Sequence, residues 1–223
     1  MVQALDANLL ISFRCYFGGG TAIVLRYGEY RESRDIDFLV SDIDGYRQLR
    51  QLVIGPDGIN ALTHHPLTQL REVRADQYGI RTLLEIDGEP IKFEIIHEGR
   101  ISLDTPGGDD QVCGVATLTR LDTASSKLLA NADRWADRSV FSRDLIDLAM
   151  MQPTPSILDE AVAKTDRAYG DSTVRSLHSA VAYLRDDPSR LDECMSALGM
   201  WDTPKALLWQ RITILAEYLT RGE

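Results

Sequence analysis

Three consecutive glycines interrupt an apolar stretch near the start of this chain of 223 residues. Residues 15–17 are apolar and short enough for a strand, residues 18–20 are glycine, and residues 21–27 have the composition of a helix capped by Thr21. A glycine turn between a strand and a helix lets backbone N–H groups approach a ligand oxygen closely. This order predicts an α/β unit with an anion site where the helix begins.

Two aspartates follow at a spacing that places them on one side of a strand. Residues 36–40 are largely apolar, and Asp35 and Asp37 alternate with Ile36 and Phe38. Like charges at this spacing, about 7 Å apart, repel each other. Mg²⁺ relieves such repulsion, since it prefers carboxylate and phosphate oxygens. Glu94 is the candidate third carboxylate, because its neighbours alternate toward a core and leave it facing the other way.

A phosphate cradle beside paired carboxylates favours nucleotidyl or phosphoryl transfer over hydrolysis of a peptide or a sugar. Divalent cations at such a site lower the pKa of an acceptor hydroxyl and neutralise charge on leaving pyrophosphate. The candidate nucleotide-binding residues are Gly19, Gly20, Thr21 and Arg34. The expected cofactor is Mg²⁺ or Mn²⁺, and the expected substrate is an NTP.

The rest of the chain divides into a mixed part and a helical part. Alternating segments 81–86 and 91–96 flank Asp87-Gly88, which predicts a β-hairpin. After residue 119 the apolar spacing becomes helical. We expect short helices over 5–12 and 45–53, a Gly-, Pro- and His-rich loop after the second, an α/β core over 1–115 and a helical domain over 116–223.

Composition excludes several classes of protein. Hydrophobic residues make up 44% and charged residues 26%, as in soluble globular proteins. A formal net charge of −10 argues against non-specific coating of nucleic acid, although Arg26, Arg31, Arg34 and Arg134 are compatible with a local basic cluster. The chain has no apolar run that could cross a membrane, no export signal is seen, and three scattered cysteines favour the cytoplasm.

The motifs together resemble a known family. Residues 17–38, FGGGTAIVLRYGEYRESRDIDF, look like the AbiE-type (AbiEii/AbiGii toxin) nucleotidyltransferases of the DNA polymerase β-like superfamily. A second signature of that family matches residues 127–148, KLLANADRWADRSVFSRDLIDL. The likeness covers roughly residues 15–150 and implies a mixed sheet with flanking helices, followed by a helical C-terminal half. Gly20 stands where many members of the superfamily have serine, and Thr21 is the candidate to supply that hydroxyl.

The resemblance also implies roles for individual residues. Asp35 and Asp37 bind the metal ions, Glu94 is the third acidic position, Lys127 contacts the triphosphate, and Asp144 is the downstream catalytic acid. It implies a toxin of a bacterial toxin–antitoxin or phage-defence pair, with a cognate antitoxin and an RNA such as tRNA as the acceptor. Two alternatives stay open: a small-molecule transferase of the antibiotic-modifying kind, and a catalytically silent binding module of the same fold.

Other acidic patterns are interpreted as local structure. Asp42-Ile43-Asp44 leads into the helix predicted over 45–53, so we expect capping there. Gly107-Gly108-Asp109-Asp110 lies in a polar stretch and predicts a loop. Cys15 falls in an apolar strand and is expected to be packed rather than reactive.

Overall fold

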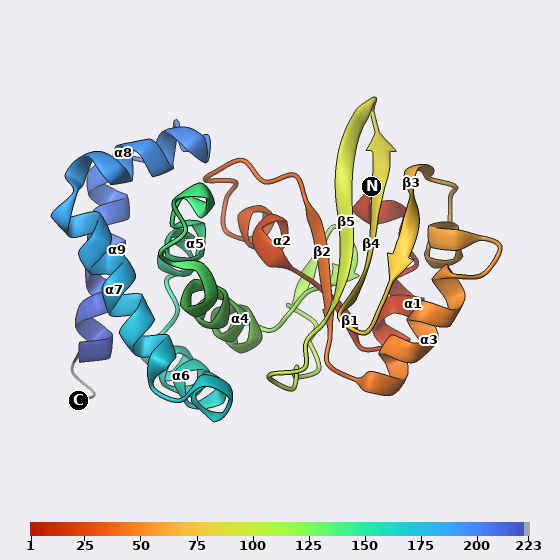
Figure 1. The fold of residues 1–223 in the computed structure, drawn as a ribbon, viewed down its shortest axis with the longest axis horizontal. Coiled ribbons are helices and arrows are strands. Elements are labelled where there is room, and N and C mark those ends of the chain that lie inside the picture. Colours follow the sequence, from red (N-terminus) through yellow and green to blue (C-terminus); the bar gives the residue numbers. More distant parts are fainter. Residues whose placement is uncertain (221–223) are drawn as a thin grey trace. The chain divides into compact units, whose positions relative to one another are not determined.

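A computed structural model describes residues 1–220 (Figure 1). The chain forms two compact units. The first contains Met1–Leu25 and Arg34–Thr119, and the second contains Arg26–Ser33 and the chain from Arg120 onward. The short segment Arg26–Ser33 belongs to the second unit although it lies inside the sequence of the first. No sequence pattern had indicated this assignment.

The first unit is built on a five-stranded mixed sheet, as the α/β class predicts. Its strands are β1 (Cys15–Gly18), β2 (Ile36–Val40), β3 (Thr68–Ala75), β4 (Gly79–Ile86) and β5 (Glu89–His97). The order across the sheet is β1-β2-β5-β4-β3. The β2–β5 pair is parallel, and the other neighbours are antiparallel. A two-stranded ribbon of β6 (Gln111–Val112) and β7 (Val115–Ala116) completes the set.

One face of the sheet is covered by helices. Helices α1 (Ala7–Ser12) and α3 (Ile43–Val53) lie on the same side of the strands (Figure 1). The buried core contains Phe17, Phe38 and Phe93, whose successive ring centroids lie 5.3 and 5.9 Å apart. Each large apolar side chain buried in this way contributes about 1.5–3 kcal/mol. Because side chains alternate along a strand, Asp37 and Glu94 point to the opposite face.

Local signals placed several boundaries well. Asp42 Oδ2 accepts a hydrogen bond of 2.7 Å from the Gly45 backbone, so α3 begins at Ile43, two residues before the prediction. The hairpin turn is confirmed, with Asp87 and Gly88 at φ +51° and +82° between β4 and β5. Strand β3 was not predicted, since its side chains are mostly exposed and polar and show no alternation.

The second unit is helical, as predicted. Its helices are α4 (Arg120–Arg134), α5 (Arg143–Met151), α6 (Pro155–Tyr169), α7 (Ser172–Asp186), α8 (Pro188–Ala197) and α9 (Lys205–Thr220). Helix α2 (Gly19–Arg26) leads from the first unit into Arg26–Ser33. Short 3-10 turns occupy Val2–Ala4, Gly58–Leu62 and Arg138–Val140. No helix within residues 1–220 has both the length and the apolar character that crossing a membrane requires.

The three cysteines lie in different surroundings. Cys15 is buried in β1, as predicted, and Cys194 is buried in α8. Burial raises the pKa of both thiols, that of Cys15 well above the usual range. Cys113 is exposed at φ +51° in the tight turn between β6 and β7. The chain therefore carries two inert thiols and one that solvent reaches.

Candidate functional site

A row of four residues crosses the sheet at the level of the predicted acidic pair. Gly18 is opposite Asp37, Asp37 is opposite Glu94, and Glu94 is opposite Arg81. Partners in register project from the same face of a sheet, and neighbouring strands lie about 4.8 Å apart. The row lies on the face that α1 and α3 leave uncovered. Asp37 and Glu94 are therefore neighbours, as the sequence predicted.

The glycine turn brings the start of α2 beside Asp37. Gly19 is the first residue of α2 and has φ +66°, a conformation that glycine adopts without strain. A Cβ atom at this position would overlap the Asp37 carboxylate. The first N–H groups of a helix have no partner within the helix. An anion held by Asp37-bound cations would meet these donors at the same place.

Thr21 has a different role from the predicted cap. It lies inside α2, and its Oγ1 donates a hydrogen bond to the main-chain oxygen of Asp35. This bond ties the first turn of α2 to the segment that enters β2. Asp35 lies one residue before β2 and is exposed, as is Arg34, whereas Asp37 is half-buried within the strand. The acidic pair therefore brackets the first residue of β2.

Glu94 is neutralised by two basic side chains on the sheet. Arg81 Nε lies 2.9 Å from Glu94 Oε1, and Lys92 forms an ion pair with the other carboxylate oxygen. Within residues 1–220, no three His, Cys, Asp or Glu side chains converge as a ready metal-binding group. Mg²⁺ commonly uses one or two carboxylates and completes its shell with water and substrate phosphate. Asp35 and Asp37 fit that donor set, whereas the ion pairs oppose Glu94 as a third ligand.

The second half of the predicted constellation lies in the second unit, around Lys127. Its Nζ is 2.9 Å from Asp144 Oδ1 and 2.7 Å from Asp147 Oδ2. Asp144 and Asp147 are three residues apart on α5, so they share one face of that helix. Only 7% of the Lys127 side chain is exposed. Lys127 of α4 is therefore buried, and its ammonium group pairs with two carboxylates of α5.

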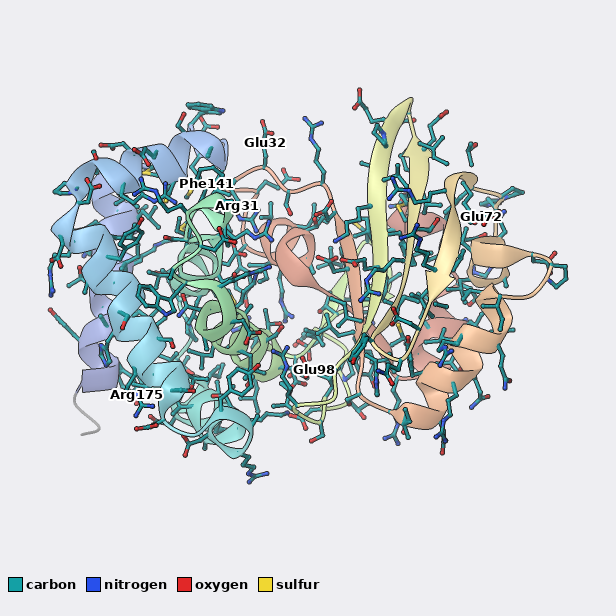
Figure 2. The ribbon with its side chains drawn as sticks, viewed as in Figure 1. Arg31, Glu32, Glu72, Glu98, Phe141 and Arg175 are labelled. Carbon is teal, nitrogen blue, oxygen red and sulfur yellow. The ribbon has the colours of Figure 1, made fainter. Side chains whose placement is uncertain are left out.

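Three more side chains complete this buried cluster. Arg134 donates to Asp144 through Nε and Nη2 at 2.7 and 3.0 Å. Arg31, labelled in Figure 2, donates to Asp147 through Nε and Nη2 at 2.7 and 2.9 Å. The Tyr30 hydroxyl donates to Asp147 at 2.8 Å. Paired donors matched to one carboxylate form strong, directional contacts.

The electrostatics of the cluster stabilise every charge in it. Burial alone would raise the pKa of Asp144, but Lys127 and Arg134 hold it well below the usual range. Burial opposes ionisation of Asp147 too, and Lys127 and Arg31 lower its pKa. Burial would lower the pKa of Lys127, yet the two carboxylates raise it. The cluster is therefore fully ionised near neutral pH, with three cations against two anions.

A strained turn directly before α5 positions Asp144 in the cluster. Phe141 and Ser142, directly before α5, have φ of +54° and +51°, which is uncommon for residues other than glycine. Arg190 of α8 holds this turn, because its Nη2 donates to the Arg138 carbonyl at 2.6 Å and its guanidinium lies 5.4 Å from the Phe141 ring centroid. Helix α8 thus fixes where α5 begins.

Sequence reasoning found part of this cluster and missed the rest. Lys127, Arg134 and Asp144 were selected through the second signature. Asp147 stood in the same signature, and its spacing from Asp144 was the available signal for a shared role. Arg31 was grouped with Arg134 only as part of a local basic cluster, and Tyr30 was not selected. Their pairing with Asp147 gave no signal, because these contacts join residues more than a hundred positions apart.

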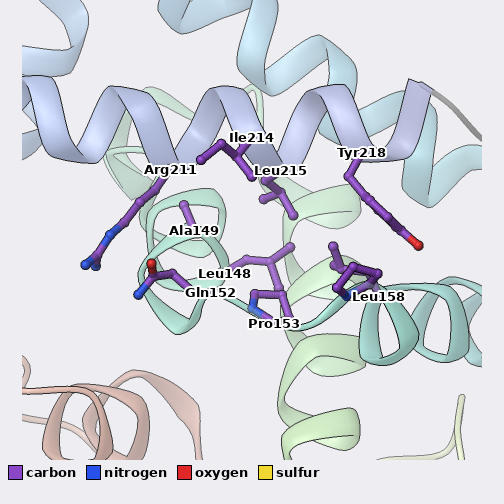
Figure 3. Close-up of a pocket in the computed structure, with 10 residues that line it drawn as sticks. Leu148, Ala149, Gln152, Pro153, Leu158, Arg211, Ile214, Leu215 and Tyr218 are labelled. Atoms are coloured by element: carbon purple, nitrogen blue, oxygen red, sulfur yellow. The ribbon is translucent and has the colours of Figure 1, made fainter.

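A separate small pocket lies among α5, α6 and α9 (Figure 3). It has a volume of about 140 Å³ and is walled mainly by apolar side chains such as Leu148, Leu158 and Leu215. Arg211 stands at its side and contacts the Met150 sulfur at 3.2 Å. No residue predicted to bind a nucleotide or metal lines it. This pocket reflects packing of the helical unit.

Two solved structures share the fold. A protein from Helicobacter pylori, provisionally assigned as a nucleotidyltransferase, aligns with a TM-score of 0.52 and 16% identity over 97% of this chain and 92% of its own. JHP933 from Helicobacter pylori aligns with a TM-score of 0.50 and 15% identity over 97% of this chain and 89% of its own. Comparison with curated protein sequences gives no significant match.

The family itself is shown by sequence. Residues 4–211 match the family described as nucleotidyl transferase AbiEii toxin, type IV toxin–antitoxin system. The match covers both units, including the glycine turn, the acidic pair and the Lys127 cluster. The chain therefore belongs to the AbiEii toxin family and is a nucleotidyltransferase.

Proposed function

We propose that this enzyme transfers a nucleoside monophosphate from an NTP to a hydroxyl of an RNA acceptor, in the cytoplasm and with a divalent cation. The observation that carries the proposal is the position of Gly19. Any side chain there would overlap the Asp37 carboxylate, so this glycine is required for α2 to begin beside the acidic pair. Helix donors for phosphate and carboxylates for a cation therefore meet at one place.

The residues of the first unit have complementary tasks in this proposal. Asp35 and Asp37 hold Mg²⁺ or Mn²⁺, which when bound neutralises charge on the triphosphate. The backbone donors at Gly19 and Gly20 bind phosphate oxygen, and Thr21 keeps α2 in position through its bond to Asp35. In the reaction the acceptor oxygen bonds to the α-phosphorus and loses its proton to water. The bond from that phosphorus to the β-phosphate oxygen breaks, and pyrophosphate leaves.

The role of Lys127 at the triphosphate stays a prediction. An ammonium group has three donor hydrogens, and Asp144 and Asp147 accept from two of them. One donor is left for a further acceptor. The surplus of positive charge in the cluster favours an anion as that acceptor. In this proposal Asp144 orients Lys127 through their ion pair, and its role as the downstream catalytic acid stays a prediction.

The test is transfer of label from each α-³²P NTP, with Mg²⁺ or Mn²⁺, to total RNA. Asp37→Asn should abolish transfer, whereas the matched change Asp57→Asn should leave it intact, because Asp57 is exposed and its side chain makes no capping hydrogen bond. Label on a small hydroxyl compound instead of RNA would favour the alternative of a small-molecule transferase of the antibiotic-modifying kind. No transfer and no NTP binding would favour the silent module.

The toxin role predicts a protein partner as well. Family membership in a type IV toxin–antitoxin system supports a cognate antitoxin encoded with this chain. We expect growth to stop when the enzyme alone is expressed and to recover with the antitoxin. Expression of Asp37→Asn should leave growth unaffected. Arrest by that variant would show that toxicity does not depend on transfer.

A further inference from the structure

The first unit contains a pocket with a partly polar lining, and no predicted site residue lines it. It has a volume of about 700 Å³, within the range of small-molecule sites. Its lining includes Tyr46, Arg47, Arg50, Tyr78, His97 and Arg100, and we call it the basic aromatic pocket. His97 ends β5 three positions after Glu94, so side-chain alternation places it on the opposite face of the sheet. The pocket is therefore distinct from the row that contains Asp37.

Flat groups are layered at this pocket. The Tyr46 and His97 rings are nearly parallel, at 8°, with centroids 4.7 Å apart. The Arg50 guanidinium lies 6.0 Å from the Tyr46 centroid. The Tyr46 hydroxyl donates to the Asp76 carbonyl at 2.6 Å, which fixes the ring. Tyr78 is 65% exposed. Aromatic rings and guanidinium planes are the surfaces on which unpaired bases stack.

The pocket is positively charged on an acidic protein. Its lining contributes three guanidinium groups and one carboxylate, that of Glu98 (Figure 2), so the formal balance is +2, compared with −10 for the chain. Arg100 pairs with Glu98 at 2.7 Å, and Arg47 pairs with Asp44 at 3.2 Å. These partners lower the positive potential without removing it.

Arg50 supplies the observation that points to a ligand. Within residues 1–220 it has no carboxylate partner, and its Nε is buried without a hydrogen-bond acceptor. Buried polar groups are almost always paired in folded proteins, and a guanidinium pairs especially well with phosphate. The Arg50 guanidinium lines the pocket, so an anionic oxygen that enters it would pair with this side chain.

We propose that the basic aromatic pocket binds one nucleotide of a single-stranded segment of the acceptor RNA. The base stacks at Tyr78 and His97, and the phosphate binds Arg50 with help from Arg47 and Arg100. The proposal rests on the proposed function, because it takes the acceptor to be RNA. It explains how an enzyme with a net charge of −10 holds a polyanion: a local site replaces a broad basic face.

The experiment measures RNA binding without any reaction. Fluorescence anisotropy of a labelled 12-nucleotide single-stranded RNA is recorded with the full chain, without NTP or divalent cation. We expect Arg50→Gln and Tyr78→Ala each to weaken binding about tenfold, as loss of a phosphate or stacking contact does. Arg50→Gln should also reduce the salt slope by about 0.7. Arg175→Gln and Trp201→Ala are the matched controls, since both side chains are exposed and lie outside the pocket.

Each outcome has a defined meaning. Absence of RNA binding by the wild type, or unchanged binding by both pocket variants, would overturn the proposal. So would competition by free AMP or UMP at the affinity of the strand, because the pocket would then be a mononucleotide site. Far-UV circular dichroism establishes that each variant folds. Binding that depends on Arg50, together with no label transfer to RNA, would uphold the pocket and refute the proposed reaction.

Discussion

The carboxylate of Asp147 is shared by three side chains of the second unit. It accepts from Tyr30, Arg31 and Lys127, and its side chain is fully buried. Paired charges inside a protein contribute little net stability compared with apolar side chains, yet removing one partner leaves the others unpaired. The cluster therefore fixes the positions of its side chains more than it adds to stability. It also makes the unit sensitive to single substitutions.

Asp147→Asn should be strongly destabilising for this reason. Asn cannot compensate the charges of Arg31 and Lys127, and breaking a buried ion pair costs about 3–5 kcal/mol. Urea unfolding followed by tryptophan fluorescence measures the loss. The control is Asp192→Asn, which removes an exposed pair with Lys205 in the same unit, worth at most about 1 kcal/mol. Equal midpoints for the two variants would contradict this account of the cluster.

Lys127→Met should separate the effect of Lys127 on NTP binding from its effect on stability. Asp144 keeps Arg134 and Asp147 keeps Arg31, so each carboxylate retains a paired arginine. We expect a smaller loss of unfolding free energy than for Asp147→Asn, together with a higher KM for NTP if Lys127 contacts the triphosphate. Normal KM and normal stability in this variant would contradict the predicted role of Lys127 at the triphosphate.

The pH dependence of stability follows from the same groups. The pKa values of Asp144 and Asp147 are lowered on folding, so their contribution is present above about pH 4 and is lost as pH falls through the folded values. The pKa of Lys127 is raised, so its contribution is present below about pH 10 and is lost as pH rises through the folded value. We expect a plateau in the urea midpoint between these limits. Asp147→Asn should show a shallower acid decline.

At the scale of elements, the start of α2 carries the strongest constraint. Gly19 needs both its positive φ and the absence of a side chain, whereas Gly28, at φ +96°, has no atom within 4 Å of a Cβ. Gly19→Ala should therefore abolish label transfer by displacing Asp37. Gly28→Ala also strains the backbone, but it displaces no neighbouring side chain and should keep transfer. Activity in Gly19→Ala would refute the proposed arrangement of the glycine turn and acidic pair.

Elements with strong local signals could be predicted from sequence. The Asp87-Gly88 hairpin and the Asp42 cap each depend on a few neighbouring residues. Strand β3 could not be predicted, because its pairing with β4 is decided by the sheet and its own side chains are exposed. The assignment of Arg26–Ser33 to the helical unit depends on the distant Asp147. Of the candidate site, the placement of Asp37 beside Glu94 was predictable by alternation, and the neutralisation of Glu94 by Arg81 was not.

At the scale of the whole molecule, the unfolding of each unit can be measured separately, because each has its own buried side chains. All three tryptophans, Trp135, Trp201 and Trp209, lie in the second unit. Leu49 of α3 is fully buried in the first. Leu49→Ala, which costs about 2–5 kcal/mol, should speed hydrogen exchange in β4 and β5 and leave the tryptophan-monitored midpoint in place. A shift of both signals would show that the two units unfold together.

The contrast among the cysteines has a practical consequence. Cys113 presents its sulfur to solvent on a ribbon outside the acidic row, while Cys15 and Cys194 are enclosed. A maleimide dye or nitroxide added to the unmutated chain should attach at one position. Such a reporter would follow antitoxin docking and RNA binding by energy transfer or magnetic resonance, without any engineered cysteine.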